Sequence, residues 1–107
     1  MEANDESQEI ELKVYNLLKN VIDPELGVNV IDMGLVYEIY YTQTEGIVVN
    51  HTLSSKNCPM GDIIIEDIKN ALKENLPELK HCVNLVWEPE WTSDFITPKG
   101  KELLNMN

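Results

Sequence analysis

The stretch from Leu53 to Asp62, LSSKNCPMGD, joins an apolar, β-branched run to an amphipathic run. A residue that precedes proline is pushed towards extended backbone geometry, and proline suits the first position of a helix. Cys58-Pro59 is therefore predicted to be a helix N-cap followed by the first helical residue. The unpaired N–H groups of that helix would favour a thiolate at Cys58, and a thiolate binds metals or attacks electrophiles. This stretch predicts a strand-to-helix junction that carries a candidate reactive cysteine.

The runs on either side of this stretch predict its neighbouring elements. Apolar residues at helical spacing after it predict a helix over about 59–76, which Pro77 ends. Before it, two runs rich in Val, Ile and Tyr, 35–41 and 47–53, flank a short polar segment that contains glycine, and this pattern is typical of a hairpin. The central part of the chain therefore predicts strand, strand, helix.

The ends of the chain complete the predicted fold. Helical spacing predicts a first helix over about 6–20, a third strand covers 83–87, and Thr97-Pro98 begins a short closing helix. Residues 28–33 are left without a predicted state, and residues 91–96 are expected to be irregular. The fold class is α/β (α+β): a three-stranded mixed sheet with helices on one face. We expect a single domain over residues 1–107, with a core of about 6–91 and a tail of 92–107.

Composition and charge exclude several classes of function. The formal net charge is −11, and the eight basic residues are lysines spread along the chain, so neither nucleic acid nor an anionic membrane is an expected partner. No apolar run has the length of a membrane span, and the N-terminus is acidic where a secretory signal is basic. The expected location is the cytoplasm, where the two cysteines are expected to stay unpaired.

Several side chains allow both a functional and a structural interpretation. Asp23 and Glu25 flank a proline. In the functional interpretation they are cation ligands or acceptors for a partner's N–H groups. In the structural interpretation they only end the helix and form a turn. Asp32 either caps a turn or lies near the Cys58 loop. Cys58 itself is either an exchangeable ligand or a small buried residue.

The remaining candidates lie on or after the predicted strands. His51 is on the apolar face of its strand, where a histidine is either a hydrogen-bonded core group or a metal ligand. Glu88, Glu90 and Trp91 follow the third strand and form either a ligand-facing loop or a solvated rim over a packed ring. Cys82 is expected to be structural.

Four motifs occur in a defined order along the chain: Asp23-Pro24-Glu25, Ile31–Tyr37 (IDMGLVY), Thr52-Leu53 with Cys58-Pro59, and Glu88–Trp91 (EPEW). Together they resemble the SufT-like family of small iron–sulfur cluster assembly domains, also called the MIP18 or DUF59 family. The resemblance implies an iron–sulfur cluster assembly domain-like fold and a role in the maturation of iron–sulfur proteins.

The resemblance also implies a site. Cys58 would be the family's reactive or metal-binding cysteine, with an acidic surface of the same site beside it. The residues expected to shape this site are Asp23, Glu25, Asp32, Thr52, Glu88 and Trp91.

The number of cysteines limits the kinds of iron–sulfur function that the chain can have. An iron–sulfur cluster generally takes four thiolates, whereas this chain has two cysteines and no Cys-x-x-Cys pair. We therefore expect a non-enzymatic carrier or adaptor that holds a cluster or iron transiently through Cys58, shared with a second copy in a homodimer or with a partner. The expected partners are iron–sulfur carriers and apo-target proteins. Three alternatives stay open: an interaction adaptor without metal, a thiol enzyme that uses Cys58 with His51, and a PaaD-like accessory factor of an oxygenase complex.

Overall fold

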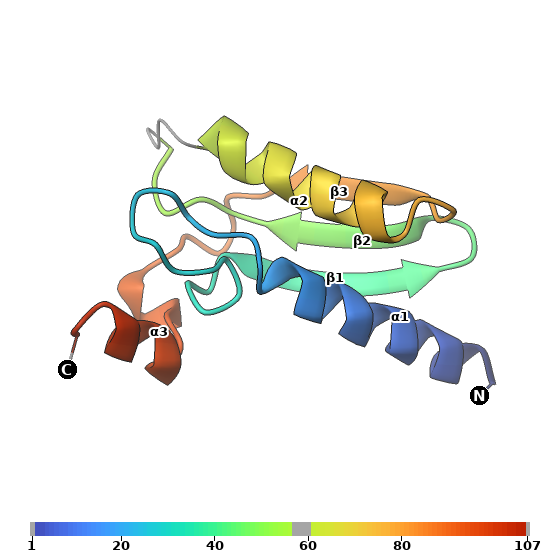
Figure 1. The fold of residues 1–107 in the computed structure, drawn as a ribbon, viewed down its shortest axis with the longest axis horizontal. Coiled ribbons are helices and arrows are strands. Elements are labelled where there is room, and N and C mark those ends of the chain that lie inside the picture. The colour runs from blue at the N-terminus through green and yellow to red at the C-terminus, as the bar shows by residue number, and fades with distance from the viewer. Residues whose placement is uncertain (1, 57–60, 107) are drawn as a thin grey trace.

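The fold consists of two long helices against one face of a small sheet, with a short helix at one end (Figure 1). The computed structural model describes residues 2–56 and 61–106, with side chains from residue 6 onwards. The elements in chain order are α1 (Glu2–Leu18), β1 (Val36–Thr42), β2 (Gly46–His51), α2 (Gly61–Asn75), β3 (His81–Leu85), the 3₁₀ turn η1 (Ser93–Phe95) and α3 (Pro98–Leu103). This order confirms the predicted fold class. None of the helices in the described ranges has the length and apolar character needed to cross a membrane.

The sheet is mixed, with β2 in its centre. β2 pairs antiparallel with β1 through a tight turn and parallel with β3, to which α2 connects it. In this register Val49 lies opposite Ile39 on one side and Val83 on the other. A parallel pair requires a crossover, and α2 supplies it over the same face that α1 covers (Figure 1).

The core lies between this face and the two long helices. Alternate residues of a strand point to the same face, and Ile47, Val49 and His51 of β2 all point to the helices and are buried, as the sequence pattern predicts. α1 contributes buried residues at helical spacing, among them Val14 and Leu18. The buried residues within α2 are Gly61, Ile64, Ile68 and Leu72. Burying a Leu, Ile or Val side chain is worth about 1.5–3 kcal/mol, so this face stabilises the whole layer.

Several local features go beyond the sequence-based expectations or differ from them, and α1 covers Glu2–Leu18 where about 6–20 was predicted. The third strand begins at His81 and ends at Leu85, two residues earlier at each end than predicted. The segment expected to be irregular contains η1, whose cap Thr92 accepts a hydrogen bond at its hydroxyl from the N–H of Asp94 at 3.3 Å. The stretch without a predicted state forms turns, and Asn29 makes an isolated bridge with Ile22.

β1 contains an irregularity that matters for the surface of the sheet. Val36 pairs with His51 and Glu38 pairs with Asn50, so Tyr37 is an extra residue on the β1 side. Such a bulge bends the strand and turns the extra side chain away from its regular position. The chain after β3 passes this point and reaches the turns before β1, where Ile96 is buried.

Candidate functional site

A small cavity lies where β2 ends and the chain enters the predicted Cys58 loop. Its volume is about 290 Å³. The lining residues are Leu53, Ser54, Ser55, Lys56, Trp87, Glu88, Glu90 and Trp91. The cavity thus lies between the residues that begin the loop and the segment that follows β3. Cys58 lies outside the described residues, so its N-cap position and its reactivity stay predictions.

Hydrogen bonds on both sides hold the end of β2 at this cavity. The N–H of Val86 donates to the carbonyl of His51 at 2.8 Å, and the N–H of Thr52 donates to the carbonyl of Leu35 at 2.8 Å. Leu53 is buried against the start of α2, where a Cβ added to Gly61 would lie 2.6 Å from its Cδ1. The last residues of the strand and the first residue of the helix therefore have fixed positions.

The two tryptophans fix the other side of the cavity. The indole N–H of Trp91 donates to the carbonyl of Met33 at 2.8 Å, which ties the segment after β3 to the turns before β1. The Lys56 ammonium lies 5.6 Å from the centroid of the Trp87 ring, a cation–π distance. Glu88 and Glu90 are exposed at the same rim. The structure thus brings Glu88 and Trp91 beside the residues that lead to Cys58, while their roles stay predictions.

Asp23 is buried and holds a turn. Its Oδ1 accepts hydrogen bonds from the N–H of Glu25 at 2.8 Å and from the N–H of Leu26 at 3.3 Å. The backbone N–H of Asp23 donates to the carbonyl of Val28 at 2.9 Å. This is the pattern by which an aspartate stabilises a turn through its own side chain. The geometry therefore favours the interpretation of Asp23 as a helix stop and turn residue, and it leaves Glu25 with an exposed side chain in that turn.

Asp32 is buried and binds two segments at once. Its Oδ2 accepts from the amide of Asn29 at 2.8 Å, and its Oδ1 accepts from the hydroxyl of Thr97 at 2.9 Å. Burial acts to raise the pKa of Asp32, but the hydrogen bonds from Asn29 and Thr97 and two lysine charges outweigh it and lower the pKa below 3.8. Asp32 is therefore an ionised acceptor whose two oxygens both have partners.

His51 and Thr52 place two polar atoms in the interior at the end of β2. His51 is 1% exposed, and its Nδ1 lies 3.3 Å from the carbonyl of Thr52. Burial lowers the pKa of His51, the bond to that carbonyl opposes the shift, and the charge of Lys69 lowers the pKa further. Neither His51 Nε2 nor Thr52 Oγ1 has a hydrogen-bond partner within the described part of the chain. A neutral His51 that donates from Nδ1 thus presents an unused lone pair at Nε2.

Cys82 lies away from this end of the sheet. It pairs with Val48, three residues before His51 on β2, or about 10 Å along the strand. Its thiol is exposed and lies 3.2 Å from the Oδ1 of Asn84, so it is not a packed core residue. Among residues 2–56 and 61–106, no group of three or more His, Cys, Asp or Glu side chains is arranged to hold a metal ion.

Two partners of the candidate residues were missed from the sequence. Asn29 and Thr97 bind Asp32, and only Thr97 carried a signal, because Thr97-Pro98 marks the start of a helix. Nothing in the sequence pattern connects a residue of the closing helix with a turn 65 positions earlier.

The fold and the cavity define a small α+β domain with its candidate site at the end of the central strand, where a strand-to-helix loop meets an acidic segment that contains tryptophan. The chain belongs to the iron–sulfur cluster assembly protein family, whose model matches residues 11–83. This confirms the resemblance, and the matched range contains the first three of the four motifs.

Individual relatives cover nearly the whole domain. The chain is 41% identical over 88 residues to the Fe-S protein maturation auxiliary factor SufT of Staphylococcus aureus, an alignment that spans 81% of this chain and 99% of that protein. It is 37% identical to the auxiliary factor YitW of Bacillus subtilis, over 87% of this chain and 91% of that protein. The crystal structure of a domain of unknown function, DUF59, from Bacillus anthracis superposes with a TM-score of 0.89 at 35% identity, over 97% of this chain and 99% of that one.

Proposed function

We propose that this protein is a non-enzymatic factor in the maturation of iron–sulfur proteins, and that Cys58 is the ligand through which it carries a cluster or iron. The observation that carries the proposal is the cavity between residues 53–56 and the segment 87–91, because it adjoins in sequence the loop that contains Cys58. The names of the SufT and YitW relatives, both maturation auxiliary factors, support the role in assembly.

Because the chain has few thiolate ligands, it would bind a cluster or iron only transiently. The chain has two cysteines, and Cys82 lies on β3 opposite Val48, back from the strand end where the loop begins. A cluster that takes four thiolates must then share its ligands with a second copy of the chain, a partner protein or a small thiol. A shared cargo is released more readily than one enclosed by a single chain, and this suits transfer to apo-proteins.

The acidic candidate residues act in two different ways in this proposal, and of these only Glu88 and Glu90 line the cavity. Asp23 and Asp32 use their carboxylates to hold turns and the closing helix, so they shape the site through the fold. Glu88 and Glu90 are exposed at the cavity rim beside Trp91 and face whatever docks there. The proposal thus assigns metal binding to Cys58 and leaves the carboxylates as positioning or docking groups.

Paired cysteine variants test the proposal. In cells whose only copy is Cys58→Ser, we expect the activity of a client iron–sulfur enzyme to fall, while Cys82→Ser leaves it at the wild-type level. Both variants are expected to keep the wild-type stability in urea, since Cys82 is exposed and a cysteine-to-serine exchange replaces a single sulfur atom by oxygen. Normal maturation in the Cys58→Ser strain would refute the assignment.

Reconstitution separates a carrier from an adaptor without metal. After anaerobic incubation with iron and sulfide, a carrier shows visible charge-transfer absorption that Cys58→Ser removes and Cys82→Ser retains, and its mass in solution shows whether a second copy shares the cargo. Colourless protein whose Cys58 resists iodoacetamide in the native state would favour the adaptor.

A further inference from the structure

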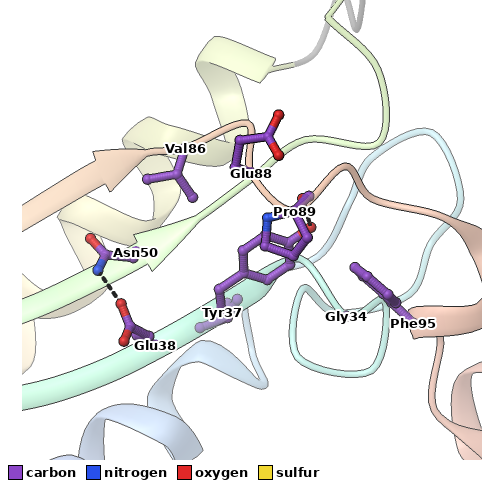
Figure 2. Close-up of a pocket in the computed structure, with 9 residues that line it drawn as sticks. Gly34, Tyr37, Glu38, Asn50, Val86, Glu88, Pro89 and Phe95 are labelled. Atoms are coloured by element: carbon purple, nitrogen blue, oxygen red, sulfur yellow. Dashed lines mark hydrogen bonds between the residues drawn. The ribbon is translucent and has the colours of Figure 1, made fainter.

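A second groove lies on the face of the sheet that α1 and α2 leave uncovered (Figure 2). Because side chains alternate along a strand, Glu38 and Asn50 point to this face when their neighbours Ile39 and Val49 point to the core. The volume of the groove is about 640 Å³, more than twice that of the cavity at the loop. Its lining residues are Gly34, Val36, Tyr37, Glu38, Asn50, Val86, Glu88, Pro89 and Phe95.

The aromatic wall of this groove is held in place by contacts between distant segments. The hydroxyl of Tyr37, the bulge residue of β1, donates to the carbonyl of Pro89 at 2.7 Å. The rings of Tyr37 and Phe95 meet edge to face, with centroids 5.9 Å apart. Phe95 nevertheless keeps 37% of its surface exposed. The Phe95 ring therefore adds fixed apolar surface to the wall of the groove.

The acidic groups of the groove come from two sides. Glu38 lies on β1, and its Oε1 accepts a hydrogen bond from the Asn50 amide at 2.7 Å (Figure 2). Asn50 in turn accepts from the amide of Asn84 at 2.9 Å, so a ladder of side chains across the sheet orients the Glu38 carboxylate. Burial and, after it, the charge of Glu88 raise the pKa of the Tyr37 hydroxyl. No lysine is among the lining residues.

We propose that this groove docks a segment of a partner protein that presents an arginine between apolar residues. A guanidinium stacks on aromatic faces and pairs with carboxylates through a planar set of donors, and the groove offers Tyr37 and Phe95 for the first contact and Glu38 and Glu88 for the second. The flanking apolar residues of the partner would cover Val36, Val86 and Pro89.

The composition of the chain excludes a second copy as the source of the guanidinium. All eight basic residues are lysines, and the net charge of −11 makes two copies repel each other. The occupant is therefore a different, basic protein segment. This docking surface stands independently of metal binding, although Glu88 also lines the cavity at the loop and would bring the docked partner beside it.

Titration of the ¹⁵N-labelled full chain with acetyl-Gly-Leu-Arg-Leu-Gly-amide tests the proposal without iron. The amide signals of Tyr37, Glu38 and Phe95 are expected to shift with the peptide and to respond to salt. A matched peptide with citrulline in place of arginine keeps nearly the same shape but loses the charge and two of the five N–H donors, so we expect it to bind about 5-fold more weakly.

Two charge-neutralising variants localise the binding. Glu38→Gln keeps an acceptor for Asn50 and removes one charge, so we expect about 5-fold weaker binding of the arginine peptide. Glu78→Gln removes an equal charge from the exposed connection between α2 and β3 and should leave the affinity unchanged. Equal loss in both variants, shifts spread over the helices, or equal binding of the citrulline peptide would overturn the proposal. Shifts of the groove signals on dilution of the free protein would assign the groove to a second copy instead and would overturn it as well.

Discussion

The Asp32 carboxylate accepts a hydrogen bond from the Thr97 hydroxyl at 2.9 Å, and the Asp32 carbonyl accepts another from the Thr97 N–H at 2.9 Å. Thr97 is the N-cap of α3, where the same hydroxyl accepts from the N–H of Gly100 at 3.0 Å. A Cβ at Gly100 would lie 2.7 Å from the Asp32 carbonyl, so the helix and the turn are in close contact. A residue from the acidic motifs therefore fixes the closing helix to the body of the domain.

Replacing this carboxylate should destabilise the domain in a pH-dependent way. Asp32→Asn weakens two charge-assisted hydrogen bonds, and we expect it to lower the free energy of unfolding by about 2 kcal/mol at pH 7, measured by urea unfolding. Asp67→Asn on the exposed face of α2 is the control, expected to change the stability by less than about 0.5 kcal/mol.

The sign of the pH dependence follows from the lowered pKa of Asp32 in the folded state. The unfolded state takes up a proton near pH 3.8 while the folded state still resists it, so the stabilisation by Asp32 is complete above that pH. It is lost as the pH falls through the folded-state pKa. The difference between wild type and Asp32→Asn should therefore be constant from pH 7 to about 5 and shrink below 4. A difference that grows on acidification would contradict this account.

The turn that meets η1 depends on glycine at position 34. Gly34 has φ 74°, and a Cβ there would lie 2.2 Å from the backbone carbonyl oxygen of Phe95. Gly34→Ala must therefore adopt a left-handed conformation and displace backbone, and we expect a loss of about 3 kcal/mol or more. Gly27 has a similar φ of 73° and nothing within 4 Å, so Gly27→Ala should cost only about 1–2 kcal/mol. Equal losses in urea unfolding would mean that the contact with Phe95 is unimportant.

Local periodicity was sufficient to predict the layer architecture. The alternation along β2 and the helical spacing of Ile64, Ile68 and Leu72 identified the buried faces, and the structure buries these residues. The end of β3 was predicted wrongly because Val86 continues the apolar run, and its N–H still donates to His51 beyond the strand. Sequence patterns report which face is buried more reliably than where pairing stops.

The candidate site was predictable only in part, because its geometry rests on contacts between distant segments. The position of Trp91 near the loop followed from the motif order, but its bond to the Met33 carbonyl depends on how the turns before β1 fold back. The bulge at Tyr37 and the groove beside it have no signal in a run of β-forming residues. The role of Cys58 stays a prediction.

Thr52 offers a test that separates the fold from the site. Its hydroxyl is buried and has no partner within residues 2–56 and 61–106, so Thr52→Val should leave the free energy of unfolding unchanged or raise it by up to about 1 kcal/mol. Thr92→Val is the contrasting variant, since that hydroxyl caps η1, and it should cost about 0.5–1 kcal/mol. If Thr52 shapes the site, as the family resemblance implies, Thr52→Val reduces client-enzyme maturation without loss of stability in urea. A clear loss of stability would assign Thr52 to the fold.

His51 should give the domain a second acid-sensitive range, above that of Asp32. Burial lowers its pKa in the folded state, so the unfolded chain binds a proton near pH 6.5 before the folded chain does. The contribution of neutral His51 to stability is then fully present above pH 6.5. The free energy of unfolding falls as the pH decreases towards the folded-state pKa of His51.

A variant of each histidine isolates this effect. His51→Leu removes the titrating ring and should abolish the decline in stability between pH 7 and 5, whereas His81→Gln on β3 should keep it. Urea unfolding of the three proteins across this range measures the slopes. If His51→Leu and wild type lose stability in parallel, protonation of His51 does not limit the stability of the fold.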